Sequence, residues 1–185
     1  SATANQVITV TSVNDAPVAV TDTYTTAEDT AVALLPLTGD NDLDGDVITV
    51  TSINGTPLTP GTAQVIAVTN GSVSIDAAGA ITFTPGIDYN GSVSFPYVIS
   101  DGNGGTATAN QDITVTSVND APVAVNDIYA TAEDTPIALL PLTGDSDLDG
   151  DAITVTSING TPLTPGTAQV IAVTNGSVSI DEAGT

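Results

Sequence analysis

The sequence contains no cysteine, methionine, tryptophan, lysine, arginine or histidine. Without cysteine it can form neither a disulfide framework nor a reactive thiol site. Without lysine and arginine it has no phosphate clamp and no basic surface for nucleic acid or an anionic membrane. Catalysis is disfavoured too, because no histidine or lysine is present to activate a serine or threonine hydroxyl. The composition therefore argues against an enzyme and against a nucleic-acid-binding protein.

All charged side chains of the sequence are acidic. The chain carries 22 acidic residues and a formal net charge of -22. Self-repulsion of this size opposes compaction, yet an apolar content of 41% indicates a folded chain. Cations must therefore come from outside the protein. Carboxylate and carbonyl oxygens, with no histidine or cysteine among the ligands, select hard ions. We expect Ca²⁺ above all as the cofactor.

Long hydrophobic runs are also missing. No stretch of about 18 apolar residues occurs, so we expect no transmembrane helix and no direct insertion into a membrane. Residue 1 does not begin a signal peptide. We expect the chain to be an interior piece of a larger protein.

A long internal repeat organises the chain. Val13–Ala80 recurs as Val118–Thr185, offset by 105 residues and with nine mismatches over 68 positions, and Thr3–Gln6 recurs as Thr108–Gln111. We therefore expect residues 1–13 to be the last strand of a preceding repeat and residues 14–118 to be one complete repeat. Residues 119–185 would form a second repeat, truncated before its final strands. Such near-identical copies usually provide length or valency.

Within one repeat the apolar residues recur with a period of two, which is typical of β-strands. Turn dipeptides such as Asn54-Gly55 and Asn90-Gly91 separate the apolar segments. This pattern predicts an all-β protein made of tandem immunoglobulin-like β-sandwiches. We expect Tyr24 and Tyr129 to pack at the core or its rim. The expected strands are 47–53, 65–69, 72–75, 81–83, 92–100 and 107–115, with Val93, Phe95, Tyr97, Ile99, Ile113 and Val115 facing the core.

An acidic loop carries the clearest chemistry. The segment Asp-Asn-Asp-Leu-Asp-Gly-Asp matches the first half of the Asp-x-Asp-x-Asp-Gly calcium loop, in which alternate carboxylates converge on one ion and glycine permits the bend. Thr51 stands at the twelfth position in place of glutamate, so the loop is not an EF-hand. A solvated acidic turn is the alternative. The candidate ligands are Asp40, Asp42, Asp44 and Asp46, and in the second copy Asp145, Asp147, Asp149 and Asp151.

Several motifs together resemble those of cadherins. The linker Val-Asn-Asp-Ala-Pro-Val at 13–18, repeated at 118–123, resembles the cadherin linker Asp-x-Asn-Asp-Asn-x-Pro. Ala-Glu-Asp-Thr at 27–30, Asp-x-Asp at 40–42, Asp-Tyr-Asn at 88–90 and Asp-Gly at 101–102 follow in cadherin order. The set is similar to the cadherin-like tandem repeats of giant secreted RTX-type bacterial adhesins, among them ice-binding adhesins.

This resemblance implies a calcium-stabilised sandwich that serves as an extender on the bacterial cell surface, outside the cell. The partners would be the neighbouring repeats, joined through Ca²⁺ at the linkers, while the adhesive target would bind elsewhere in the full protein. Asn90 in place of glutamate, and a shortened linker, leave the number of ions open. The implied ligands are Asn14, Asp15, Asp40, Asp42 and Asp101 at the first junction, Glu28, Asp88, Asn119, Asp120, Asp145 and Asp147 at the second, and Glu133 at the position equivalent to Glu28.

Each assignment has a simpler alternative. Asn14 and Asp15 can form a turn that only joins domains, and Asp88 can be a turn former. Glu28 can be a solvated carboxylate at the start of a strand, and Asp101 can be a hairpin residue. We expect the isolated Asp76, Asp112 and Asp181 only to aid solubility. For the whole chain, the alternative to a spacer is a glycan- or protein-binding sandwich that acts by avidity.

Overall fold

The computed structural model describes residues 1–182. The chain divides into two compact units, Ser1–Val118 and Asn119–Thr185, which we call unit 1 and unit 2 and describe separately. All regular elements of the described residues are strands. Within residues 1–182, no helix has the length and apolar character needed to cross a membrane.

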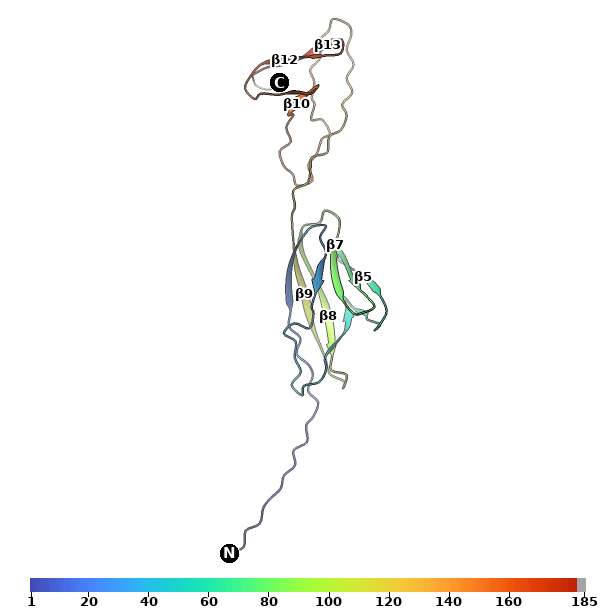
Figure 1. Ribbon diagram of the computed structural model, residues 1–185, viewed down its shortest axis with the longest axis vertical. Helices are drawn as coiled ribbons and strands as arrows, with labels where there is room; N and C mark the ends of the chain where they lie inside the picture. Colours follow the sequence, from blue (N-terminus) through green and yellow to red (C-terminus); the bar gives the residue numbers. More distant parts are fainter. Residues whose placement is uncertain (183–185) are drawn as a thin grey trace. The chain divides into compact units, whose positions relative to one another are not determined.

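Unit 1 is a sandwich of two sheets (Figure 1). One sheet has five strands in the order β1-β9-β8-β3-β4, and the other has four in the order β2-β7-β6-β5. All described pairs are antiparallel except β1 and β9, which run parallel. The strands are β1 (Asp22–Ala27), β2 (Val32–Leu34), β3 (Thr49–Ile53), β4 (Thr56–Pro57), β5 (Gln64–Val68), β6 (Gly71–Ile75), β7 (Ile81–Pro85), β8 (Gly91–Ser100) and β9 (Thr106–Thr116).

The core lies between the two sheets, where alternate residues of each strand point inward. All six side chains expected to face the core from β8 and β9 are buried, so this prediction is confirmed. Phe83 of β7 faces Phe95 of β8 with ring centroids 6.2 Å apart. Tyr24 packs against the core while remaining partly exposed, and its hydroxyl accepts the Leu35 N–H. The all-β sandwich predicted from periodicity is therefore observed.

Three strands of unit 1 were absent from the sequence-based prediction, namely β1, β2 and the two-residue β4. β1 reads Asp-Thr-Tyr-Thr-Thr-Ala, and its inward positions include the polar residues Asp22 and Thr26, both buried. β2 has only three residues. Apolar alternation is too weak in β1 and too short in β2 to be recognised. β1 nevertheless holds an edge of the five-stranded sheet through its parallel ladder with β9.

Over residues 119–182, unit 2 contains four short strands in two separate pairs. These are β10 (Ser157–Ile158) with β11 (Thr161–Pro162), and β12 (Gln169–Val173) with β13 (Gly176–Ile180). Residues 127–132, which repeat β1, form no strand. Leu139 is 40% exposed, whereas its counterpart Leu34 in unit 1 is 3% exposed. This apolar position is thus covered in unit 1 and open in unit 2, whereas Ile171 is as buried as its counterpart Ile66, at 4% exposure each.

Candidate metal centre

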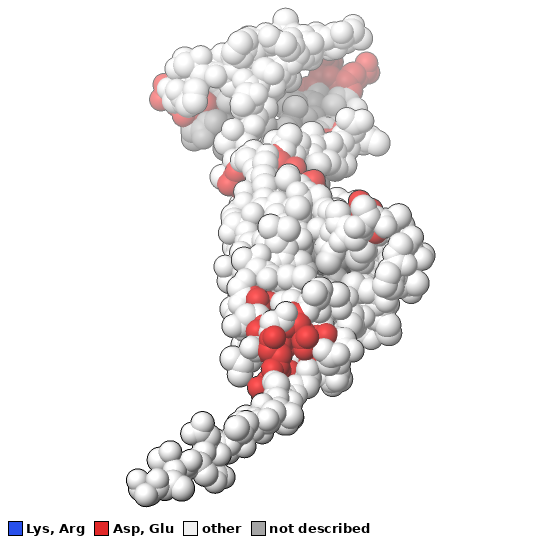
Figure 2. Space-filling view, turned by 60° about the horizontal axis from the view of Figure 1, so that its bottom comes forward, with Lys and Arg blue, Asp and Glu red and all other residues white. Residues whose placement is uncertain are grey.

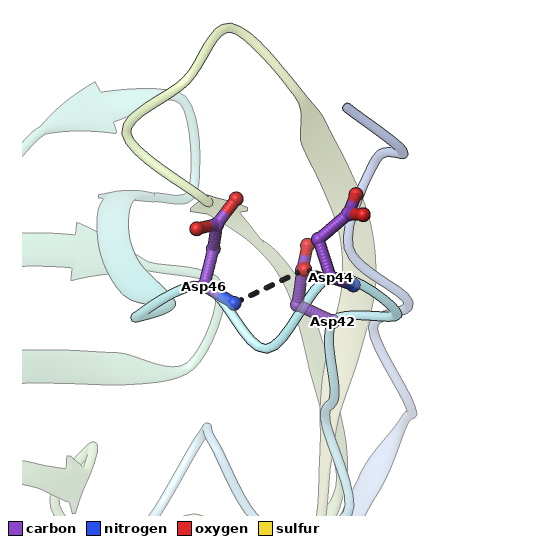
Figure 3. A group of neighbouring side chains, drawn as sticks. All are labelled: Asp42, Asp44 and Asp46. Carbon is purple, nitrogen blue, oxygen red and sulfur yellow. Dashed lines mark hydrogen bonds between the residues drawn. The ribbon is translucent and has the colours of Figure 1, made fainter. Parts of the chain in front are cut away.

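The acidic loop of unit 1 connects β2 to β3 and is folded around one carboxylate. Asp42 Oδ1 accepts the backbone N–H groups of Asp44 at 2.9 Å and Asp46 at 3.2 Å. Gly45 has φ of 80°, a conformation that glycine adopts without steric cost. Figure 3 shows the three aspartates projecting from this single turn. The loop therefore brings alternate carboxylates together, as its spacing predicts.

Asp42, Asp44 and Asp46 each offer one carboxylate oxygen, and these oxygens all lie within 4.8 Å of one another. Two ligands of one calcium ion at 2.3–2.6 Å are separated by at most about 5 Å, so the spacing fits a shared ion. Asp42 Oδ2 is buried and has no hydrogen-bond partner. The donor set consists of oxygen atoms alone, which suits a hard cation.

The linker and a distant hairpin attach to the same carboxylates. The backbone N–H of Asp15 donates to Asp44 Oδ2 at 2.7 Å, and the Ser12 hydroxyl donates to Asp44 Oδ1 at 3.0 Å. The side-chain amide of Asn103, in the β8–β9 loop, donates to Asp46 Oδ2 at 2.7 Å. Two segments far apart in the sequence, the linker and the β8–β9 hairpin, therefore meet at the acidic loop. No acidic motif marks Ser12 or Asn103, and only their positions beside expected ligands could have pointed to them.

Asp101 is hydrogen-bonded both to Asn14, the other expected ligand in the linker, and to the β8–β9 hairpin. Its carboxylate accepts the Asn14 side-chain amide at 2.9 Å and the backbone N–H groups of Asn103 and Gly105. The residue is only 4% exposed. The hydrogen bond from Asn14, supported by the backbone donors, outweighs burial and lowers the pKa of Asp101. Asp101 thus holds the hairpin, as the simpler alternative proposed, and also anchors the linker.

Asp40 lies apart from the three clustered carboxylates. Its Oδ1 accepts the Val20 N–H at 2.7 Å, and the Tyr97 hydroxyl lies 3.0 Å from its Oδ2. Burial of Tyr97, with the nearby charge of Asp40, raises the pKa of the phenol. The sequence groups Asp40 with the aspartates that follow it. In the structure its carboxylate instead joins a polar cluster at the end of the core.

Asp22 belongs to this inner polar cluster and was not a predicted site residue. It is 8% exposed, and its Oδ2 accepts the Gln111 side-chain amide at 2.7 Å. Gln111 is 1% exposed and its Oε1 has no hydrogen-bond partner. Burial, reinforced by the charge of Asp40, raises the pKa of Asp22. Only the opposed positions of these residues on parallel strands bring them together, which the sequence does not reveal.

Glu28 and Asp88 occupy the loops where β1 ends and where β8 is about to begin. Glu28 is 4% exposed and its Oε1 accepts the Val118 N–H, so the alternative of a solvated carboxylate is wrong. The backbone N–H of Asp88 donates to Asp29 Oδ1 at 3.2 Å, which places the two loops together. Asp88 itself is exposed and has φ of 54°, consistent with a turn former. Both expected residues thus lie near the end of β9.

Unit 2 repeats the backbone hydrogen bonds of the acidic loop, but among the described residues the clustering of three carboxylate oxygens within 4.8 Å is found only for Asp42, Asp44 and Asp46. Asp147 Oδ1 accepts the N–H groups of Asp149 at 3.0 Å and Asp151 at 3.1 Å. Asp120 N–H donates to Asp149 Oδ2 at 2.7 Å, as Asp15 does to Asp44 in unit 1. Asp145 Oδ1 accepts the Val125 N–H at 2.8 Å, in the manner of Asp40. The amide of Asn119 turns back to its neighbour's carbonyl oxygen, and Glu133 is exposed.

Figure 2 shows acidic side chains gathered in a patch on unit 1 beside the N-terminal segment. The chain provides no lysine, arginine or histidine to offset them. Two unit charges 4 Å apart repel by about 1 kcal/mol even in bulk water, and by more near a protein surface. The clustered carboxylate oxygens of Asp42, Asp44 and Asp46 could hold a metal ion.

No curated protein matches the chain. One solved structure, a nucleoside hydrolase-related hypothetical protein from Saccharophagus degradans that is associated with carbohydrate metabolism, matches with 15% identity and a TM-score of 0.35. The match covers 57% of this chain and 26% of that one. The bacterial Ig domain family matches residues 14–114 and 119–185. The two matched segments span most of the sequence, and the chain therefore belongs to the bacterial Ig domain family.

Proposed function

We propose that this chain is a stretch of spacer repeats in which Ca²⁺ binds at the linker end of each sandwich and stiffens the array. The supporting observation is the attachment of the linker and the β8–β9 hairpin to the clustered aspartates Asp42, Asp44 and Asp46. An ion held there also acts on the linker, because Asp15 and Ser12 are hydrogen-bonded to Asp44. Binding would therefore restrict the hinge as well as neutralise charge.

The proposal extends to the junction between successive repeats. Glu28 and Asp88 of one repeat, with Asn119, Asp120, Asp145 and Asp147 from the next, are the ligands implied by the cadherin-like motifs. Glu133 would serve the following junction. The partners of each repeat are then its neighbours in the same chain. We place the array in a secreted adhesin of the RTX type on the bacterial cell surface, with the adhesive target bound elsewhere in that protein.

A matched pair of variants tests the metal site. Asp42→Asn and Asp76→Asn remove one charge each, and both aspartates accept the backbone N–H groups two and four residues ahead. Only Asp42 has carboxylates close by, so its loss should weaken Ca²⁺ binding at least tenfold in calorimetric titration. Asp76→Asn should bind as the unmodified chain does. Equal affinities for both variants would show that the acidic loop is merely a capped turn.

Thermal unfolding provides a second readout. An ion that binds the folded state alone stabilises it by mass action, so millimolar CaCl₂ should raise the Tm of unit 1 above its value in chelator. Asp42→Asn should remove most of that increase. Identical Tm values with and without chelator would contradict the proposed calcium dependence.

The spacer mechanism requires a separate test. In small-angle scattering of a tandem of three complete repeats, calcium should give a maximum dimension near the summed lengths of the domains. Chelator should shorten and broaden the distribution, because like charges beside each linker then act without a bridging ion. Folded domains with identical profiles in both conditions would leave calcium as a stabiliser of single domains and exclude the rod.

A further inference from the structure

The segment that follows β9 is held to unit 1 by one glutamate. The backbone N–H of Glu28 donates to the Thr116 carbonyl oxygen at 2.9 Å, and its carboxylate accepts the Val118 N–H. Glu28 is only 4% exposed, so water competes little for this carboxylate. Hydrogen bonds to an ionised acceptor are stronger than those between neutral groups. Unit 1 therefore fixes the chain as far as the N–H of Val118.

Unit 2 holds the same linker from Asp120 onward. The backbone N–H of Asp120 donates to Asp149 Oδ2 at 2.7 Å. Val123 and Ser146 then exchange two backbone hydrogen bonds, at 2.8 and 3.1 Å. The acceptors and donors in unit 2 all belong to its acidic loop. This part of the linker is therefore attached to the repeat that follows it.

Unit 1 shows the same attachment of its own preceding linker. Asp15 N–H donates to Asp44 Oδ2 at 2.7 Å, and Val18 exchanges backbone hydrogen bonds with Asn41 at 2.7 and 3.1 Å. Asn41 is replaced by Ser146 in the second copy. The exchange is tolerated because only backbone groups form the pair of bonds. The attachment is thus a property of the repeat.

We propose that successive repeats turn about a pivot confined to Val118 and Asn119, with Glu28 holding one side and Asp149 the other. Each peptide bond is planar, so only the φ and ψ angles of these two residues lie between the two held N–H groups. The pivot goes beyond the proposed calcium sites, since both sides are held by direct hydrogen bonds that need no ion. Repeats joined in this way change direction while the distance across the linker stays nearly fixed.

Hydrogen exchange of single backbone amides tests the pivot in the isotope-labelled 185-residue chain. Chelator is present throughout, so that no metal contributes. The N–H groups of Val118 and Asp120 should be protected about tenfold more than that of Asn119, because both donate to carboxylates. Nuclear relaxation should show fast backbone motion centred on Asn119.

Two substitutions in the acidic loop of unit 2 form a matched pair. Asp149→Ala and Asp151→Ala each remove one charge from an exposed position, but only Asp149 accepts the Asp120 N–H. Asp149→Ala should lower the protection of the Asp120 amide about tenfold. It should also extend the fast motion from Asn119 to Ala121. Asp151→Ala should change neither quantity.

Glu28 provides the test on the other side of the pivot. Glu28→Ala should release the Val118 amide, whereas Glu28→Gln keeps an acceptor oxygen and should retain most of its protection. Since Glu28 is buried, the loop variants still decide the matter where Glu28→Ala does not fold. Equal protection of the three amides, or the same response to Asp149→Ala and Asp151→Ala, would overturn the pivot. Neither outcome bears on calcium binding, which titration measures separately.

Discussion

Asp42 and Asp76 hold their turns in the same way, each with one carboxylate oxygen bonded to the N–H groups two and four residues ahead. Backbone capping accounts fully for Asp76, which is more than the solubilising residue expected from the sequence. In the acidic loop, the same capping accounts for the carboxylate of Asp42 but not for those of Asp44 and Asp46, which cluster with it. Asp101, buried and well supplied with donors, has a lowered pKa, while buried Asp22 with one donor has a raised pKa. The number of donors thus decides the behaviour of each acid.

At neutral pH, Asp22→Asn should stabilise unit 1 by about 1 kcal/mol, because the new amide can donate to the unpartnered Gln111 Oε1 and still accept from its Nε2. The pKa of Asp22 is raised above 3.8, so the unmodified protein loses stability relative to the variant as pH rises through the folded-state pKa. Denaturant unfolding at several pH values should show the advantage shrinking as pH falls through the folded-state pKa toward the unfolded-state value of about 3.9.

Asp112→Asn is the control for the loss of charge. Asp112 lies on the same strand as Gln111 and accepts the Ser94 hydroxyl from the outer face of the sheet. An equal gain from both substitutions would assign the effect to net charge. A loss of stability in Asp22→Asn would show that the buried carboxylate is itself favourable.

At the scale of elements, identical sequences have different environments in the two units. The β5–β6 hairpin and the β12–β13 hairpin have the same sequence and register. In unit 1 the hairpin packs against β7, and Val73 is fully buried. Among the described residues of unit 2 it pairs with no further strand, and Val178 is partly exposed. Local sequence therefore forms the hairpin, and a third strand buries it.

Gly71 and Gly176 occupy the same position in these hairpins and provide a matched test. A Cβ on Gly71 would lie 2.5 Å from the Thr84 carbonyl oxygen and 2.7 Å from the Phe83 ring, whereas one on Gly176 meets nothing within 4 Å. Gly71→Ala should therefore destabilise unit 1 by about 1 to 3 kcal/mol, as overpacking of a core does. Gly176→Ala should cause no such loss of stability in its own hairpin, as measured by thermal unfolding. If both substitutions lowered stability equally, the loss would come from replacing glycine itself and not from the contacts of the added Cβ.

At the scale of the whole molecule, charge of a single sign acts on every part of the chain. Repulsion among exposed carboxylates is screened over about 8 Å at physiological ionic strength, whereas a bound ion acts locally and more strongly. In chelator, raising NaCl from 20 to 300 mM (~0.02 to ~0.3 M) should increase the Tm. With saturating Ca²⁺ the same change should have a smaller effect. A Tm that is equally sensitive to NaCl in both conditions would indicate that calcium neutralises none of the charge that opposes folding.

The sequence by itself determined the sandwich, most of its strands, the inward faces of β8 and β9 and the acidic loop, because alternation and turn dipeptides are local signals. Asp42, Asp44 and Asp46 converge through one turn, so their spacing was sufficient to predict it. Only the tertiary structure decided that Asp40 turns to Tyr97 and that Asp22 meets Gln111. Those contacts join residues 57 and 89 positions apart. They depend on strand order and register, which are set by the packing of the two sheets and leave no local pattern in the chain.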